Sequence, residues 1–268
     1  MNRFFYITAA LGTFFFSFSA SAEDINIHAD KQVEWHSKDQ KMVAIGNAVA
    51  NKKDLEIRAQ ELTAFYEKTK AGKQQISKIS ARDDVKMKSG ETKAFGDKMD
   101  YDLAADKALL LGKPAKIQTV TDTITAEDGI TYYPSEQKAV AEGNVYATNG
   151  ESKIYSDKLV SFFEKDTAGK TVMKKVEVYG HVKIVTKDGT VLADKGIYQP
   201  KIGIVKLYDN VMIDQKGNKL HGDFAETNLN TGISKMLAGK GGKKRVTGTF
   251  KEKAKDAAAP TKGKNNVQ

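Results

Sequence analysis

Hydrophobic and polar residues alternate with a period of two in short runs along most of the chain. In the stretch from 143 to 165, the residues predicted to share one buried face are Val145, Ala147, Ile154, Ser156, Leu159, Ser161 and Phe163. This period indicates β-strands with one buried face, and no segment shows a sustained helical period. Dipeptides typical of tight hairpin turns separate the runs, at Ser89-Gly90, Asn149-Gly150, Asp188-Gly189 and Gly217-Asn218. The pattern therefore predicts antiparallel strands joined by hairpins.

Two long stretches of the chain are similar at an offset of 97 residues. Between 46–101 and 143–198, 17 of 56 positions are identical without a gap. The identical pairs include Ile57 with Ile154, Leu62 with Leu159, and Tyr101 with Tyr198. Similarity at a fixed offset is the sequence signature of a repeat architecture.

A shorter signature recurs within the long repeat. It consists of an aliphatic residue, a spacer, a small residue, and then usually an acidic residue and often Lys. The small residue is Ala29, Ala59, Gly96, Ala126, Ser156, Ala193 or Gly222, at intervals of 29 or 30 residues, or of 37 where a longer loop is present. Each unit also carries a Gly-Asn-Val step or a related one, such as Gly143-Asn144-Val145. The unit is thus a hairpin of about 30 residues, repeated about seven times.

One hairpin is marginally stable alone, so neighbouring hairpins must stack to bury a shared face. The predicted fold class is all-β: a single elongated, antiparallel structure with free strand edges at both ends. Its inward positions mix large residues with Ala, Ser and Gly. A filled core favours Leu, Ile, Val and Phe. Two interpretations follow: the small residues leave space along the interior, or they let two sheet faces approach closely.

The N-terminus has the pattern of an export signal. Arg3 precedes an apolar run from Phe4 to Ser19, and Ala20-Ser21-Ala22 provides the small residues of a cleavage site. The run is short for a membrane span. We therefore predict a signal peptide over 1–22, cleaved after Ala22, a repeated β-domain over 23–250, and a basic disordered tail over 251–268.

The net charge of +9 is unevenly distributed. Residues 239–268 carry nine Lys and Arg against two acidic residues, and Arg3 adds one more positive charge, which leaves only +1 for residues 23–238. A nearly neutral body with a solvated basic end does not indicate nucleic-acid binding. The chain contains no cysteine, so we expect neither disulfides nor thiol chemistry.

No catalytic or metal-binding motif stands out. The four histidines, His28, His36, His181 and His221, are scattered, and the acidic residues recur once per unit, which suits a structural role. The sequence Ala168-Gly169-Lys170-Thr171 resembles the end of a phosphate-binding loop, but Glu164 stands where that motif needs glycine. We predict no enzyme activity, no metal and no cofactor.

With its signal segment, its GNV-type hairpins and its I-x-A-D-K second strands, the chain resembles the OstA-like (LptA) family of periplasmic lipopolysaccharide-transport proteins. The resemblance covers about residues 23–238. It implies an open β-jellyroll whose apolar groove carries lipopolysaccharide acyl chains from the inner to the outer membrane. The groove would then be lined by Leu55, Ile57, Leu62, Val85, Ile124, Val145, Ile154, Leu159, Phe163, Val182, Ile184, Val191 and Tyr198.

The resemblance also implies partners that pair with the free strand edges. These would be an inner-membrane LptC-like protein, an outer-membrane LptD-like protein, and further copies of the chain joined head to tail. The predicted edge strands are the first, near Ile25 and Ile27, and the last, near Val246 and Phe250. The chain is longer than a minimal family member, so it is either the main bridge protein or a related module.

Two other functions compete with the lipid conduit. A structural scaffold or adhesin would have a dry, tightly packed interior and bind only proteins. A polysaccharide-acting enzyme on a β-solenoid would show unrepeated Asp, Glu or His residues clustered on one face, and the sequence has no such cluster.

Overall fold

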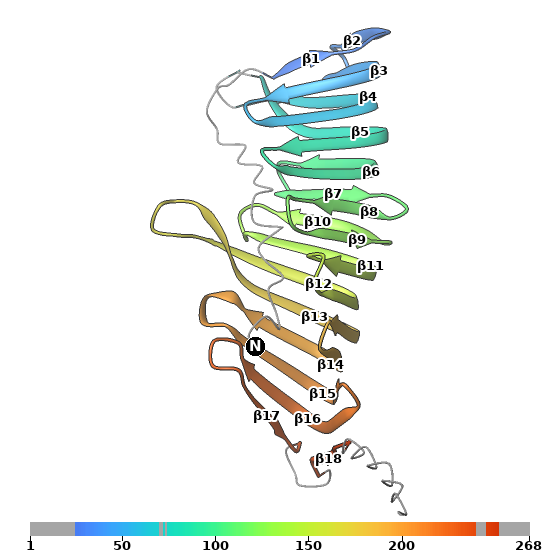
Figure 1. Ribbon diagram of the computed structural model, residues 1–268. Helices are drawn as coiled ribbons and strands as arrows, with labels where there is room; N and C mark the ends of the chain where they lie inside the picture. Colours follow the sequence, from blue (N-terminus) through green and yellow to red (C-terminus); the bar gives the residue numbers. More distant parts are fainter. Residues whose placement is uncertain (1–24, 70–71, 73, 240–244, 252–268) are drawn as a thin grey trace, which may run out of the picture.

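A computed structural model describes residues 25–69, 72, 74–239 and 245–251 of the chain. The described residues form one antiparallel sheet, in which the strands stack in sequence order along the long axis (Figure 1). The all-β, elongated architecture predicted from the sequence is confirmed. The elements are β1 (Asn26–His28), β2 (Gln32–His36), β3 (Lys41–Lys52), β4 (Leu55–Lys68), β5 (Gln74–Ser89), β6 (Thr92–Asp102), β7 (Lys107–Leu111), β8 (Ala115–Gln118), β9 (Thr123–Ala126), β10 (Gly129–Tyr133), β11 (Lys138–Thr148), β12 (Lys153–Lys165), β13 (Thr171–Thr186), β14 (Gly189–Gln199), a 3-10 turn η1 (Pro200–Ile202), β15 (Ile204–Gln215), β16 (Asn218–Asn228), β17 (Ile233–Leu237) and β18 (Thr247–Thr249).

The sheet is divided lengthwise into two halves by a register shift in every ladder that joins two long strands. In β12 the break separates residues 153–156 from 158–165. Residues 158–165 of β12, together with the segments that pair with them across the stack, form half-sheet A. Its short strands are β2, β7, β10 and β17. The part that contains 153–156 is half-sheet B, and it includes β1, β8, β9 and β18. Each long strand crosses from one half to the other.

The break between the halves, here called the corner, explains the recurring Gly-Asn step of the sequence. The register shifts lie at Gly46-Asn47, Asp83-Asp84, Gly143-Asn144, Gly180-His181 and Asp209-Asn210, all with positive φ. Glycine, Asn and Asp tolerate this backbone best, and a bulge there bends the strand. At Gly143 a Cβ atom would lie 2.5 Å from the carboxyl carbon of Asp128, so a side chain has no room.

Side-chain hydrogen bonds run along the corner from unit to unit. The side chain at each bulge hydrogen-bonds to the acidic residue of the signature that precedes it in the sequence: Asn47 to Asp30 (2.8 Å), Asn144 to Glu127 (2.7 Å), His181 to Asp157 (2.8 Å) and Asn210 to Asp194 (2.7 Å). The recurring acidic residues therefore hold the corner together, as their repetition suggested.

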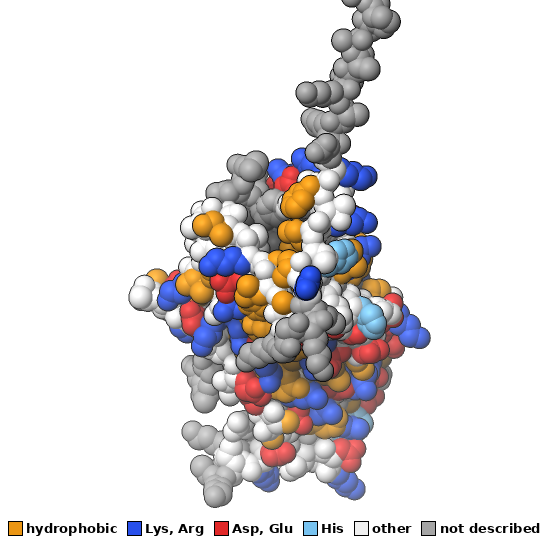
Figure 2. All heavy atoms as spheres, turned by 90° about the horizontal axis from the view of Figure 1, so that it is seen from below, with side chains coloured by type: hydrophobic (Ala, Val, Ile, Leu, Met, Phe, Trp, Pro, Cys, Tyr) orange, Lys and Arg blue, Asp and Glu red, His pale blue; other side chains and the backbone are white. Residues whose placement is uncertain are grey.

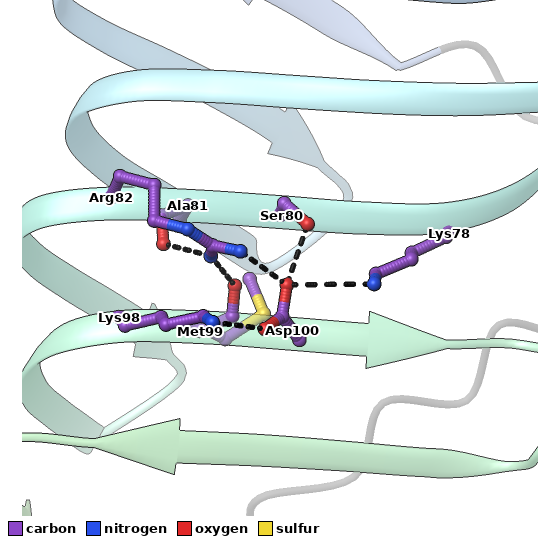
Figure 3. A network of polar contacts seen from close by, with 7 residues as sticks. All are labelled: Lys78, Ser80, Ala81, Arg82, Lys98, Met99 and Asp100. Atoms are coloured by element: carbon purple, nitrogen blue, oxygen red, sulfur yellow. Dashed lines mark hydrogen bonds and ion pairs between the residues drawn. The ribbon is translucent and has the colours of Figure 1, made fainter.

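A second polar network ties β5 to β6 on the outer face of half-sheet A (Figure 3). Oδ1 of Asp100 accepts hydrogen bonds from Ser80 Oγ at 2.6 Å and from Arg82 Nη2 at 2.8 Å. Nζ of Lys98 lies 3.3 Å from the other carboxylate oxygen. Burial opposes ionisation of Asp100, but the hydrogen bonds and the charge of Arg82 outweigh it and lower the pKa to about 2.

The core lies between the two half-sheets and is continuous along the stack. Residues in register form rows across the strands. One inward row of half-sheet A, nearest the corner, runs through Leu62, Ala81, Met99, Leu110, Ile130, Ala141, Leu159, Val178, Gly196, Leu207 and Ala225. Buried residues from all units join in one apolar cluster. Every hairpin thus adds its share to a single core, as stacking repeats require.

Candidate lipid-binding interior

The interior between the half-sheets is the one extended apolar region that the described residues enclose. A second inward row of half-sheet A, nearer the loops, contains Tyr101, Ala108, Tyr132, Ala139, Ser161, Val176 and Tyr198 in register. Tyr132 and Tyr198 are separated by the small residues Ala139 and Ser161 and by Val176. The row therefore has less side-chain volume in its middle than on either side.

A cavity of about 40 Å³ lies at this gap in the row. Its lining is almost wholly apolar and comes from β9 and β11–β15: Ile124, Ala147, Ile154, Leu159, Ser161, Met173, Val176, Val178, Ile184, Gly196, Ile197, Tyr198, Val205 and Leu207. Position 196 has no room for a side chain, because a Cβ atom there would lie 2.8 Å from Cγ2 of Val178 on the neighbouring strand. The volume holds only a few water molecules, far less than a fatty acyl chain. In this state the small residues let the half-sheets approach closely.

The thirteen residues predicted to line a groove all face the interior. Eleven are buried, and Leu55 and Tyr198 are partly buried against the core. Five of them, Ile124, Ile154, Leu159, Ile184 and Tyr198, come together at the cavity. The other eight lie elsewhere in the core: Leu55, Ile57, Leu62, Val85, Val145, Phe163, Val182 and Val191. Their inward orientation is a structural observation, whereas their contact with lipid stays a prediction.

The list made from the sequence omitted several lining residues. Met173, Val176 and Val178 lie on β13, and Val205 and Leu207 lie on β15. Val176 with Val178, and Val205 with Leu207, follow a period of two that was present in the sequence, whereas Met173 lies beyond a register shift in β13 and breaks that period. Gly196 could not be recognised in this way, because only the close approach of Val178 explains it.

Two polar atoms in the interior have no hydrogen-bond partner among the described residues: Ser161 Oγ and Asp122 Oδ1. Ser161 lines the cavity, whereas Asp122 lies in the turn between β8 and β9, directly before the first residue of β9. Burial raises the pKa of the Asp122 carboxyl, although a hydrogen bond from Thr121 opposes this. Burial likewise raises the pKa of Tyr101 to about 12. These groups therefore favour their neutral forms inside the molecule.

Both ends of the stack present strands that pair on one side only among the described residues. β1 and β2 both pair with β3, and β17 and β18 both pair with β16. Trp35 is 56% exposed at one end, and Leu237 (51%) and Phe250 (72%) are exposed at the other. Figure 2 shows hydrophobic side chains gathered at the β17–β18 end. The sequence predicted the Ile25–Ile27 and Val246–Phe250 segments but missed β2 and β17, which complete each edge.

The part of the chain that the structure describes contains no cluster of three or more His, Cys, Asp or Glu residues arranged to hold a metal ion. Within the same residues, no helix is long and apolar enough to span a bilayer. The described residues offer an apolar interior and two edges with exposed apolar side chains.

A long antiparallel sheet folded over a continuous apolar core defines the class of this protein. Comparison with protein families gives two matches to the LptA/(LptD N-terminal domain) LPS transport protein family, over residues 26–138 and 124–233. The chain therefore belongs to this family, which is one of transport proteins and not of enzymes. The two matches begin 98 residues apart, close to the offset of the internal repeat.

Among solved structures, the chain is similar to LptH from Pseudomonas aeruginosa, described as the LptA homologous periplasmic component of the lipopolysaccharide transport device. The sequences are 17% identical, the TM-score is 0.43, and the alignment covers 49% of this chain and 95% of LptH. No curated protein sequence matches the chain significantly.

Proposed function

We propose that this protein carries lipopolysaccharide across the periplasm from the inner to the outer membrane, with the acyl chains held between its two half-sheets. The observation that carries the proposal is the apolar core, which runs unbroken through the stacked units between an exposed edge at each end. Membership in a lipopolysaccharide-transport family supports it.

An apolar interior would remove the main obstacle to moving a glycolipid through water, which is the exposure of its acyl chains. Burial of one methylene group is worth ~0.8 kcal/mol, so exposure of an acyl chain of about a dozen carbons costs on the order of 10 kcal/mol. The repeated units of the protein offer an acyl chain nearly the same environment at each step. Movement from one unit to the next then requires little free energy.

The small cavity means that the half-sheets must separate to admit an acyl chain. The corner is the natural hinge, because every strand already bends there at a bulge. Among the described residues, no strand pairing joins the loops of half-sheet A to those of half-sheet B. Separation therefore breaks apolar contacts that the ligand replaces, and it leaves the hydrogen-bonded ladders intact.

Spin labels on the two half-sheets test this opening. Gly150 lies in the half-sheet B hairpin before β12, and Ala168 lies in the half-sheet A loop after it. Cysteines at these positions are specific, because the chain has none of its own. We expect lipopolysaccharide to lengthen the Gly150–Ala168 distance and to leave a control pair within half-sheet B, Gly150 and Lys187, unchanged. An unchanged first distance with lipid bound would contradict the proposal.

The exposed edges are proposed to join the protein to its partners by adding strands. β1 and β2 at one end, and β17 and β18 at the other, offer free backbone groups and apolar side chains for pairing. The partners proposed are LptC-like and LptD-like proteins and further copies of the chain. Export through a signal peptide over 1–22 belongs to the same proposal, and these residues lie outside the described part.

A scaffold that binds only protein partners is the second candidate. The small volume of the cavity, about 40 Å³, favours it, since a scaffold needs no internal space for a lipid. A scaffold predicts no change in either spin-label distance on addition of lipopolysaccharide. The same experiment therefore separates the two functions.

A further inference from the structure

The outer face of half-sheet B carries a concentration of lysines. Two outward rows cross it from β5 to β14, and the strand register places in them residues 86 and 88, 93 and 95, 116 and 118, 123 and 125, 146 and 148, 153 and 155, 183 and 185, and 190 and 192. Six of these are lysines and none is acidic. We call this surface the cationic face, and its lysines are Lys86, Lys88, Lys93, Lys116, Lys153 and Lys183.

Most of these lysines lack an acidic partner. Lys86 pairs with Asp84 at 2.7 Å, but none of the other five forms an ion pair with a described residue. The nearest acidic position in register is Glu56, opposite Lys88, and its carboxylate is bound by Arg58. The outer face of half-sheet A differs, because there Lys158 pairs with Glu142, Lys175 with Glu177, and Lys206 with Glu226.

The register of the cationic face also brings like charges together. Lys88 lies directly opposite Lys93, whereas Arg58 and Lys86, which also face each other, have Glu56 and Asp84 as acidic partners. Like charges at facing positions of an antiparallel pair destabilise a sheet. The chain retains this repulsion on one face while it neutralises lysines on the other. An anionic ligand would relieve the repulsion.

Aromatic side chains lie among the lysines. Lys116 Nζ lies 4.4 Å from the centroid of the Phe95 ring, and Lys183 Nζ lies 5.9 Å from that of Tyr155. Tyr146 and Tyr155 have ring centroids 5.2 Å apart, and Tyr155 is 40% exposed. Lysines bind phosphate as point charges, and flat aromatic rings give apolar surface with a polar tip. This combination fits a phosphate-bearing saccharide.

We propose that the cationic face binds the phosphate-bearing saccharide headgroup of the lipid whose acyl chains enter the interior. The inference rests on the proposed function and adds a second binding surface to it. Strand alternation supplies the link, since on β12 Ile154 faces the cavity while Lys153 and Tyr155 face outward. Half-sheet B would thus contact the acyl chains of the lipid with its inner face and the saccharide headgroup with its outer face.

Neutral substitutions on the full-length mature protein test the proposal. The triple variant Lys88→Gln, Lys93→Gln, Lys153→Gln removes three exposed charges from the face. The matched control is Lys38→Gln, Lys174→Gln, Lys201→Gln, which removes three exposed charges elsewhere. Binding of purified lipopolysaccharide is measured for both, alongside the same material after enzymatic dephosphorylation, and thermal unfolding shows that each variant is folded.

We expect the first variant to bind the phosphorylated lipid about tenfold more weakly, the sum of three surface charge contacts, and the control to bind it as the wild type does. Binding of the dephosphorylated lipid stays equal in all three proteins. The first variant should also unfold at a higher temperature, because the Lys88–Lys93 repulsion is gone. Equal losses of affinity in both variants, or no preference of the wild type for the phosphorylated lipid, would overturn the proposed role of the cationic face and leave the proposed function standing. Absence of binding to either lipid would overturn the proposed function itself.

Discussion

Nδ2 of Asn144 donates a hydrogen bond to Oε2 of Glu127 at 2.7 Å, and this contact fastens the bulge of β11 to the segment between β9 and β10. The same relationship recurs along the corner with other acidic residues. The corner is therefore a repeated polar structure, and it holds the hinge about which the half-sheets are proposed to open.

Replacement of Asn144 by Asp should weaken the corner. Two carboxylate side chains would then face each other where an amide and a carboxylate now bond, so we expect a lower unfolding temperature than that of the wild type. Thermal unfolding of the variant and the wild type at pH 7 checks this. The control is Asn149→Asp, because Asn149 Oδ1 accepts hydrogen bonds from the backbone amides of Glu151 and Ser152, which a carboxylate also does. Equal effects of both substitutions would contradict the role of the corner contact.

Replacement by alanine should destabilise the protein far more at Gly143 than at Gly150. Both have positive φ, of 80° and 85°. A Cβ atom at Gly143 would lie 2.5 Å from Asp128, whereas one at Gly150 meets nothing within 4 Å. We expect Gly150→Ala to cost about 1 kcal/mol in backbone strain and Gly143→Ala about 1–3 kcal/mol more, measured by chemical denaturation. Similar losses at both positions would show that the corner is not closely packed.

The Asp100 network should make stability depend on acid pH. Its carboxyl has a pKa of about 2 in the folded protein against an ordinary 3.8. The folded state therefore binds its proton less tightly, so the stabilisation is present above pH 3.8 and is lost as the pH falls through 2. We expect Asp100→Asn to lower the free energy of unfolding by about 1–2 kcal/mol at pH 7, allowing for partial solvent screening. Denaturation at pH 7 and pH 2 checks this, and an equal loss at both would contradict it.

Asp122 should have the opposite dependence on pH. Burial raises the pKa of its carboxyl, so the folded state holds the proton more tightly than the unfolded chain does. The free energy of unfolding then falls as the pH rises past the ordinary value of 3.8. Asp122→Asn keeps an acceptor for Thr121 and removes the buried charge. It should raise the unfolding temperature at pH 7 and not at pH 3, and a lower temperature at pH 7 would contradict this assignment.

The sequence predicted the strands and the stacking well because both depend on local signals. Positions such as Ile57 and Ile154 fall on the inward face because strand side chains alternate, and dipeptides such as Asn149-Gly150 mark the hairpins. The repeat then fixed how the units follow each other. These signals require no knowledge of contacts between distant residues.

The division of the sheet into two half-sheets could not be predicted from the sequence as well as the strands could. The Gly143-Asn144 step was visible as a recurring motif, but nothing in one sequence distinguishes a bulge inside a long strand from the end of a strand. The cavity depends on how Tyr132, Ser161 and Tyr198 align across strands, which only the register reveals. The edge strands β2 and β17 were missed for the same reason, since the corner splits each terminal strand in two.

Photo-crosslinking in living cells tests the central claim most directly. A photoreactive residue is placed at Ile154, Leu159 or Phe163, which are buried in the interior, and at Lys153 and Lys158 of the same strand as outward controls. We expect adducts with lipopolysaccharide acyl chains at the three interior positions and none at Lys158. At Lys153, on the cationic face, we expect adducts only with the saccharide. Absence of acyl adducts at all three interior positions, in a folded and exported protein, would contradict the lipid conduit and favour the scaffold.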